Sequence, residues 1–263
     1  MFTFMTTALI LGSLLQDASP DLLGGQVPQQ DPKAVALLEE FGNQLYSPEK
    51  AGLKSLSFDL DMPGPGGVSA GTLSVDWNAT AGATGSFELA AEMKAMIPEA
   101  MLGQVQEQMS MVSEQIALIQ TNRVVSDILD DMTVKLEGVE DGYVKIVAEP
   151  RAASDETPRT LLFEDGLLAK TIQKITGPMG EVEATGMMEW KPLSETDASL
   201  VLSSTTETSA GMVQSSTFVR EKVGDFYLVT KIDGEAMGQS STLTFKNFVV
   251  NGAPMSASTP EAR

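Results

Sequence analysis

Short segments of alternating apolar and polar residues, separated by pairs of turn-forming residues, fill the second half of the chain. Asp-Gly pairs stand at 141–142, 165–166 and 233–234, and a Gly-Pro pair stands at 177–178. Such pairs favour tight hairpins, which join antiparallel strands, whereas parallel neighbours need a crossover of a dozen or more residues. The pattern therefore predicts an antiparallel meander, with strands near 132–139, 143–149, 159–164, 167–176, 181–190, 198–206, 212–220, 226–232 and 241–250.

The same period of two marks three earlier strands. Because side chains of a strand alternate between its two faces, one face of each strand is expected to be buried and the other wet. The apolar residues are Leu56, Phe58, Leu60 and Met62 in the first of these strands, and Leu73, Val75 and Trp77 in the second. A third strand is predicted near 84–90, after a Gly-containing turn.

Two segments have helical spacing instead. The first covers 33–46, where Asp31 offers a cap and Pro32 suits the first turn. The second covers 91–131, and Pro98 predicts a break close to Ile97. An apolar stripe at spacings of three and four residues runs along this second segment and must lie on an apolar surface. Its members are Leu102, Val105, Met109, Val112, Ile116 and Ile119.

A sheet of about a dozen strands curls, because strand twist accumulates. The two helical segments then have an apolar concave face to cover. We therefore expect a mainly antiparallel β fold with helices, of the α+β class. Its curved meander sheet forms an incomplete barrel, covered by an N-terminal helix and by the inserted Met-rich segment 91–131. A single sheet domain is expected over 33–252, with a disordered tail at 253–263.

Composition excludes several kinds of site. The 263 residues include 17 Lys and Arg against 36 Asp and Glu, and the net charge of -19 repels nucleic acid and anionic membrane surfaces. The sequence has no Cys and no His, so it has no thiol nucleophile, no Cys or His zinc ligand, no Ser-His-Asp triad and no disulfide. We expect a protein that is not an enzyme and that uses no cofactor, no metal and no nucleic acid.

The first residues of the chain indicate export. Residues 2–15 form an apolar run that is short for a membrane span and stands where the hydrophobic part of a signal peptide belongs. We assign 1–18 to a signal peptide and 19–32 to a linker, and expect a periplasmic or secreted protein. An uncleaved anchor or a misassigned start remains the alternative. No later stretch of the sequence is apolar enough to predict a membrane span.

The order of elements resembles that of a known family. A first helix is followed by Leu-Lys-Ser-Leu-Ser-Phe at 53–58, and a long meander closes with Ser-Thr-Leu-Thr-Phe-Lys-Asn-Phe-Val-Val-Asn-Gly at 241–252. From about Lys33 to Gly252 this resembles the periplasmic lipoprotein carriers, the LolA-like superfamily, as a divergent member. The resemblance implies a curved, incomplete barrel whose cavity is lidded by helices and receives acyl chains. In those carriers an arginine on an early strand holds the lid, but the first arginine here is Arg123, in the predicted helix, so that role cannot be carried over.

Several residues are candidates for a site. Methionines gather in the helical segment at 93, 96, 101, 109 and 111, where flexible thioether side chains suit either an acyl pocket or an irregular core. Trp77 and Trp190 lie on the inward phase of their strands, where each ring either fills the sheet's interior or lines a cavity. The candidate apolar cavity comprises Phe58, Leu60, Val75, Trp77, Met101, Val105, Met109, Val112, Ile116, Trp190 and Phe245.

Acidic groups offer a weaker candidate. Asp59 and Asp61, or the group Asp127, Asp130 and Asp131, could in principle hold a hard cation or supply an acid and a base. The strand phase turns Asp59 and Asp61 away from the apolar face, and the helical group marks the polar end of a helix. We therefore interpret both sets as solvated surface and predict no catalytic residue and no metal ligand.

Two functions from different classes follow from this pattern. In the first, the protein is a non-enzymatic envelope carrier or chaperone that binds acyl chains of lipids or lipoproteins, with envelope transport proteins as possible partners. In the second, the interior is packed shut and the protein is a structural or interaction module of the envelope that recognises a partner through a sheet edge or its acidic surface.

Overall fold

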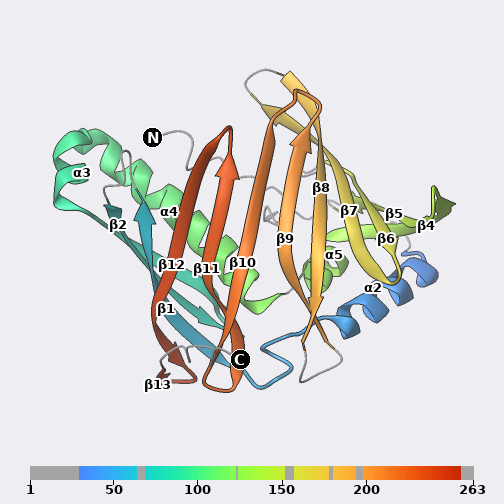
Figure 1. Cartoon of the computed structure of the whole chain (residues 1–263), viewed down its shortest axis with the longest axis horizontal. Helices are drawn as coiled ribbons and strands as arrows, with labels where there is room; N and C mark the ends of the chain where they lie inside the picture. Colours follow the sequence, from blue (N-terminus) through green and yellow to red (C-terminus); the bar gives the residue numbers. More distant parts are fainter. Residues whose placement is uncertain are drawn as a thin grey trace. The chain divides into compact units, whose positions relative to one another are not determined.

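One antiparallel sheet organises the chain. The computed structural model describes residues 30–63, 69–122, 124–151, 157–177, 180–193 and 198–255. Its strands lie in the order β3-β2-β1-β12-β11-β10-β9-β8-β7-β6-β5-β4, with β13 added to β12 (Figure 1). Because β3 and β4 are end strands that do not neighbour each other in this order, the sheet is not closed into a barrel. The predicted fold class is confirmed.

The strand bounds agree closely with the predicted meander. They are β1 (Ser55–Pro63), β2 (Ser69–Asn78), β3 (Gly82–Leu89), β4 (Met132–Glu140), β5 (Tyr143–Pro150), β6 (Arg159–Glu164), β7 (Leu167–Gly177), β8 (Gly180–Pro192), β9 (Ser199–Thr208), β10 (Val213–Val223), β11 (Phe226–Ala236), β12 (Gln239–Val250) and β13 (Ala253–Pro254). The helices are α2 (Pro32–Gln44), α3 (Ala91–Met96), α4 (Glu99–Thr121) and α5 (Val124–Asp131).

The contacts between residues divide the chain into two compact units, although the sequence predicted a single domain. Among the described residues, unit 1 contains 47–122 and 217–255, and unit 2 contains 30–46 and 124–216. The division falls within β10, so this strand contributes residues to both units.

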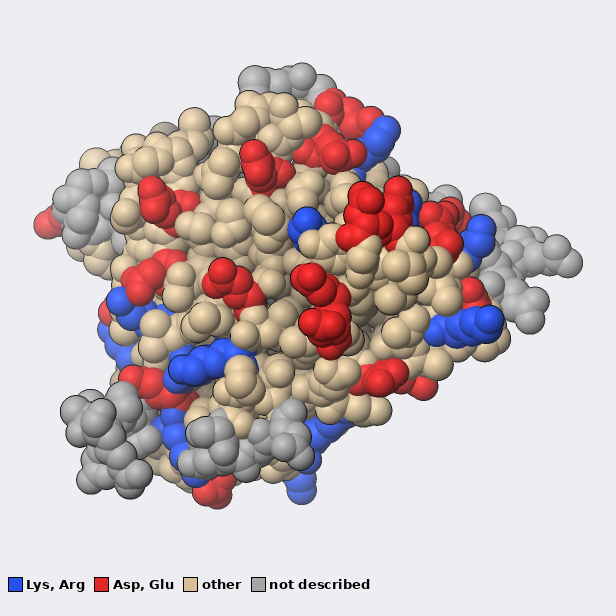
Figure 2. Space-filling view, turned by 45° about the vertical axis from the view of Figure 1, so that its right-hand side comes forward, with Lys and Arg blue, Asp and Glu red and all other residues tan. Residues whose placement is uncertain are grey.

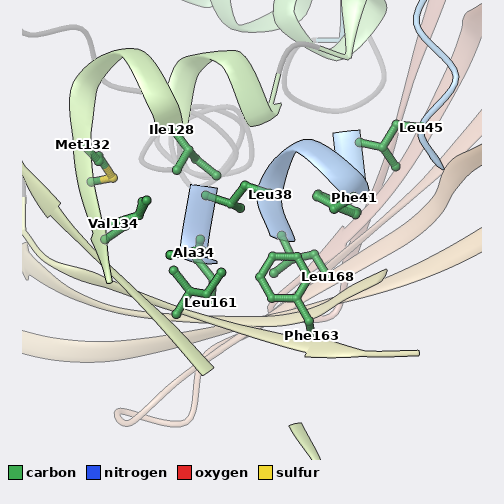
Figure 3. Close-up of a cluster of buried hydrophobic side chains, with 12 residues drawn as sticks. Ala34, Leu38, Phe41, Leu45, Ile128, Met132, Val134, Leu161, Phe163 and Leu168 are labelled. Atoms are coloured by element: carbon green, nitrogen blue, oxygen red, sulfur yellow. The ribbon is translucent and has the colours of Figure 1, made fainter. Parts of the chain in front are cut away.

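Unit 2 has a core between two helices and its strands. Helix α2 begins where the sequence predicts, because Asp31 accepts a hydrogen bond from the backbone N–H of Lys33 at 2.9 Å and Pro32 fills the first turn. Its buried residues recur at helical spacing and point toward the sheet, with α5 beside them (Figure 3). The core cluster comprises Ala34, Leu38, Phe41, Leu45, Ile128, Met132, Val134, Ile146, Ala148, Leu161, Phe163 and Leu168.

Aromatic rings fix the centre of this core. The Phe41 ring meets the Phe163 ring edge-on, with centroids 5.3 Å apart, and meets the Trp190 ring edge-on at 5.5 Å. Edge-to-face pairs of this kind add about 0.5–1.5 kcal/mol to the free energy gained by burial. The indole N–H of Trp190 donates to the Leu168 carbonyl at 2.8 Å, so its polar atom is satisfied. Trp190 is therefore inward, as predicted.

The two residues before α2 are held in place, although the sequence assigned them to a linker. Gln30 bonds through its side-chain amide to the Met132 carbonyl and the Val134 N–H of β4, at 2.9 and 2.7 Å. The Asp31 N–H donates to the Val134 carbonyl at 3.0 Å, and its carboxylate accepts from the Leu136 N–H at 3.1 Å. We call Gln30–Asp31 the strap. The rest of the predicted signal peptide and linker, 1–29, lies outside the described residues.

In unit 1 the strands of the N-terminal and C-terminal parts of the chain pair directly. Strand β1 lies between β2 and β12, and Leu60 pairs with Leu73 on one side and with Phe245 on the other. Asn251 joins the ends of the two strands, since its side-chain oxygen accepts from the N–H groups of Lys54 and Ser55 at 2.7 and 3.1 Å. Strand β13 turns back and pairs antiparallel with β12, so the predicted disordered tail does not include Ala253 and Pro254. Residues 256–263 are outside the described part.

Turn prediction succeeded at two of the four sites and failed at one. Both residues of Asp141-Gly142 and of Asp165-Gly166 have positive φ, as two-residue hairpins of this type require. The prediction for 233–234 was wrong, because Gly234 continues β11 and pairs with Ser241 of β12. The turn lies at Met237-Gly238, with φ of 53° and 74°. The Gly177-Pro178 prediction falls partly on Pro178, which is outside the described residues.

The long helical segment is broken in two places. The predicted break near Ile97 is confirmed, because α3 ends at Met96 and α4 begins after Pro98. A second break was not predicted. It lies at Asn122, whose left-handed conformation (φ 56°, ψ 46°) caps α4, with its N–H bonded to the Leu118 carbonyl. Asparagine tolerates this conformation better than most residues, which makes it a common helix end.

The Asp31 carboxylate should make a contribution to the stability of unit 2 that is lost at acidic pH. The N–H groups of Lys33 and then Leu136 lower the pKa of Asp31 below its ordinary value. The stabilisation is thus present above the unfolded pKa of about 3.9 and is lost as the pH falls through the folded value. We expect the difference in unfolding free energy between wild type and Asp31→Asn, measured by urea denaturation, to shrink as the pH falls below about 4. A difference that stays constant over this range would show that these bonds do not depend on the charge.

Candidate functional site

Helix α4 lies on the strands of unit 1 with its apolar stripe inward. It packs against β3, β2 and β11 (Figure 1). Met109, Val112 and Ile116 from the centre of the predicted stripe are 8%, 9% and 5% exposed. The end members Leu102, Val105 and Ile119 are half-buried. The predicted apolar stripe is therefore turned toward the strands, and its residues are least exposed near the middle of the helix.

The strands supply a continuous apolar layer. Five predicted site residues from β1, β2 and β12 are no more than 4% exposed: Phe58, Leu60, Val75, Trp77 and Phe245. The register places Phe58 opposite Val75, and Leu56 opposite Trp77. The Phe58 ring lies 5.4 Å from the Phe245 ring and 6.1 Å from the Phe248 ring, between centroids. Most of the predicted site residues thus come together in unit 1.

Two predicted residues do not join this layer. Met101 is 45% exposed, because it lies in the first turn of α4, before the stripe reaches the sheet. Trp190 belongs to unit 2, where it packs on Phe41. The methionine cluster is divided in the same way, since Met93 is 5% exposed and Met96 is 67% exposed. Methionine content alone therefore does not mark the layer.

A row of three polar residues, which the sequence analysis missed, fixes α4 to the strands. Gln106, Ser113 and Gln120 are seven residues apart, so they lie on one side of the helix. We call them the polar seam. The Gln120 amide donates to the Val229 carbonyl and accepts from the Val229 N–H, both at 2.8 Å, and Gln120 is 3% exposed. The regular pairing of β11 with β12 ends two residues away, at Lys231.

Gln106 makes the same arrangement at the end strand β3. In the amide orientation that satisfies both of its polar atoms, it donates to the Phe87 carbonyl and accepts from the Phe87 N–H, each at 3.0 Å. A side-chain amide carries the same donor and acceptor as a peptide group. Gln106 therefore replaces one residue of a missing neighbour of β3, and Gln120 does so at Val229, outside the regular pairing of β11 with β12. The regular spacing of Gln106, Ser113 and Gln120, seven residues apart on one side of the helix, is the sequence signal that could have predicted these contacts.

Ser113, between the two glutamines, lies against a glycine. A Cβ built on Gly85 of β3 would fall 1.7 Å from the Ser113 hydroxyl oxygen and 2.4 Å from its Cβ. Ser113 is fully buried, and its hydroxyl donates to the Met109 carbonyl at 2.9 Å, within the helix. The helix therefore approaches β3 so closely only because position 85 has no side chain.

The carboxylates that were candidates for chemistry face away from this layer. Asp59 accepts hydrogen bonds from Asn247 at 2.7 Å and from Ser74 at 2.6 Å, and these two bonds, Asn247 first and then Ser74, lower the pKa of Asp59. Asp61 forms an ion pair with Lys246 at 2.7 Å. Both aspartates are only partly buried, as expected for an outer face. No group of acidic side chains within the described ranges is arranged to hold a metal ion.

The remaining charged groups of the described residues are dispersed over the surface, except for arginines that are buried or partly buried. On the face drawn in Figure 2, acidic side chains are dispersed in small groups among uncharged ones, with basic side chains between them. Arg220 of β10 is half-buried, with its guanidinium carbon 5.5 Å from the centre of the Phe218 ring. Burial lowers the pKa of Arg220 to about 10, so it is still a cation at neutral pH.

In the part of the chain that the structure describes, no helix is both long and apolar enough to cross a membrane.

The close approach at Gly85 should make that position sensitive to one added methyl group. We expect Gly85→Ala to lower the free energy of unfolding by about 1–3 kcal/mol, because Ser113 and the helix must shift to make room. Gly103→Ala is the matched control. Position 103 is an exposed helical glycine with nothing within 4 Å of a built Cβ, so the change should stabilise the protein by about 0.5–1 kcal/mol.

Urea denaturation of the two variants measures both effects. Adding Ser113→Gly to Gly85→Ala should restore part of the loss, since it removes the two atoms that a Cβ at position 85 would meet. Equal effects of Gly85→Ala and Gly103→Ala would contradict the tight packing of α4 on β3.

Comparisons of the chain with protein-family models, with curated proteins and with solved structures find no match.

Proposed function

We propose that the protein is a non-enzymatic carrier that binds acyl chains of lipids or lipoproteins between α4 and the strands of unit 1. The observation that supports this most is the layer itself, in which methionine and aliphatic side chains of a helix lie on the apolar face of an open sheet. The proposal includes export to the cell envelope, as the apolar run at 2–15 suggests.

The chemistry of the layer suits an apolar ligand. Within the described ranges of unit 1 the buried polar residues are Ser113, Gln120, Thr121 and Thr230, and all four are uncharged, while the cation Arg220 is half-buried. Each methylene group that moves from water into such a layer contributes about 0.8 kcal/mol. Affinity for a series of saturated fatty acids should therefore rise about fourfold with each added methylene, until the layer is filled.

The attachment of α4 is compatible with admitting a ligand. Gln106 is exposed and bonds to an end strand, whereas Gln120 is buried and bonds to β11. An exposed amide exchanges its partner for water at little cost, but a buried one does not. The N-terminal half of α4 is thus the half that would move when a chain enters, with Gln120 as the fixed end.

The alternative of an interaction module loses part of its basis. Of its two predicted routes to a partner, the sheet edge is partly occupied, since Gln106 bonds to β3 and the strap bonds to β4, whereas the acidic surface is unaffected. An enzyme with two carboxylates would need both in one cleft, whereas Asp59 and Asp61 are engaged on the outer face. A carrier requires neither arrangement.

Replacement of one methionine by glutamate separates the carrier from an ordinary core. If Met109 lines a layer that opens, Met109→Glu should abolish binding of a fluorescent fatty acid and cost little stability, because the carboxylate can reach water. If Met109 is fixed core, the same change buries a charge and should lower the free energy of unfolding by several kcal/mol, roughly 3 or more. We expect the first result.

The control is Met101→Glu, which makes the same chemical change on the same helix at a side chain that is 45% exposed. It should leave both binding and stability close to those of the wild type. Wild-type protein that binds no fluorescent lipid, together with an unfolded Met109→Glu variant, would remove the carrier proposal. Native mass spectrometry of protein purified from its own envelope would identify a bound lipid directly.

A further inference from the structure

The strap bonds to four backbone groups on the edge of β4 that faces away from β5, from the Met132 carbonyl to the Leu136 N–H. The Met132 carbonyl, the Val134 N–H and carbonyl, and the Leu136 N–H all bond to Gln30 or Asp31, at 2.7–3.1 Å. Side-chain atoms of the strap make three of these four bonds. Two residues can therefore satisfy as many backbone groups of β4 as a longer neighbouring strand would. The Asp31 carboxylate also caps α2, so the helix start and the strand edge depend on one residue.

An end strand with free backbone groups is a template for pairing with another chain. The bonds of the strap show which groups of β4 face this edge: the N–H groups of Val134 and Leu136 and the carbonyl groups of Met132 and Val134. This set is self-complementary in an antiparallel pair. In a pair centred on Val134, each Val134 would bond to Val134 of the second copy, and each Leu136 N–H would meet a Met132 carbonyl. Such a pair ends before the bulge between Leu136 and Gly138.

We propose that the strap keeps the protein monomeric by occupying the edge that would otherwise pair with β4 of a second copy. The occupant of the opened edge is thus a second copy of this chain, joined β4 to β4 about a twofold axis. The N–H groups of Val134 and Leu136 lose their acceptors when the strap is removed, and a second β4 offers carbonyl oxygens in their place. The Met132 carbonyl keeps a donor, since Arg151 Nε lies 3.1 Å from it. This inference is independent of the lipid-carrier proposal.

The test is a variant that removes the three side-chain bonds to β4, leaves only the backbone bond of residue 31 to Val134 and keeps the helix cap. Gln30→Ala with Asp31→Ser does this, because serine still caps a helix but is too short to reach Leu136 as well. Sedimentation over a hundredfold range of concentration should give the mass of one chain for the wild type. The variant should pass to twice that mass as its concentration rises.

A third substitution locates the contact. Leu136→Pro removes an N–H that bonds to Asp31 and not to β5, and proline is tolerated on the free side of an end strand. Added to the strap variant, it should restore the single-chain mass. Gln104→Ala, at an exposed glutamine of α4, is the control and should remain monomeric.

Three outcomes would overturn the proposal. They are a wild type that already dimerises through β4, a strap variant that is folded by circular dichroism and monomeric at all concentrations, and a dimer that persists after Leu136→Pro. If the strap variant does not fold, Gln30→Ala is measured instead. It frees the Val134 N–H and keeps Asp31 intact, so it should still form a dimer at high concentration. A folded Gln30→Ala variant that stays monomeric would contradict the proposal.

Discussion

An open sheet leaves unpaired backbone groups at its two ends, and this constraint explains much of the structure. In a closed barrel the first and last strands would satisfy each other, but β3 and β4 are not neighbours in this sheet. Side-chain amides supply missing partners instead, from Gln106 at β3 and Gln30 at β4. Gln120 does the same inside the sheet, at Val229 of β11, outside the regular pairing with β12. Glutamine suits this task because its amide reproduces the donor and acceptor of a peptide group.

The same contacts position the candidate site. The polar seam holds α4 in one rotational setting, and in this setting Met109, Val112 and Ile116 face the strands. A helix attached only by apolar contacts could turn or slide by small steps, whereas an amide that must meet both groups of Val229 permits one placement. Polar contacts at the margin of the apolar layer thus fix which side chains of α4 belong to it.

Much of the fold could be predicted from the sequence, because alternation and turn pairs report local geometry. Periodicity placed the strands to within a few residues and showed that Phe58, Leu60 and Trp77 point inward. It failed where geometry depends on distant partners. The turn prediction at 233–234 was wrong because pairing with Ser241 extends β11 through Gly234. Gln30 and Asp31 resembled a linker, since nothing near them in sequence indicates β4, a hundred residues away. Exposure at Met101 depends on where α4 leaves the sheet, which the stripe does not report.

The pairing of β1 with β12 has a consequence for how the chain is made. Asp61 and Lys246 meet across this pair although they are 185 residues apart in sequence. On a ribosome, β1 and β2 emerge early and must wait for most of the remaining chain before β12 can cover them. Unit 2 lacks only the start of β10 once β9 has emerged, so it can fold first. The nascent chain would therefore expose an apolar strand edge for most of its synthesis, and unit 1 should be the slower and more aggregation-prone part to fold.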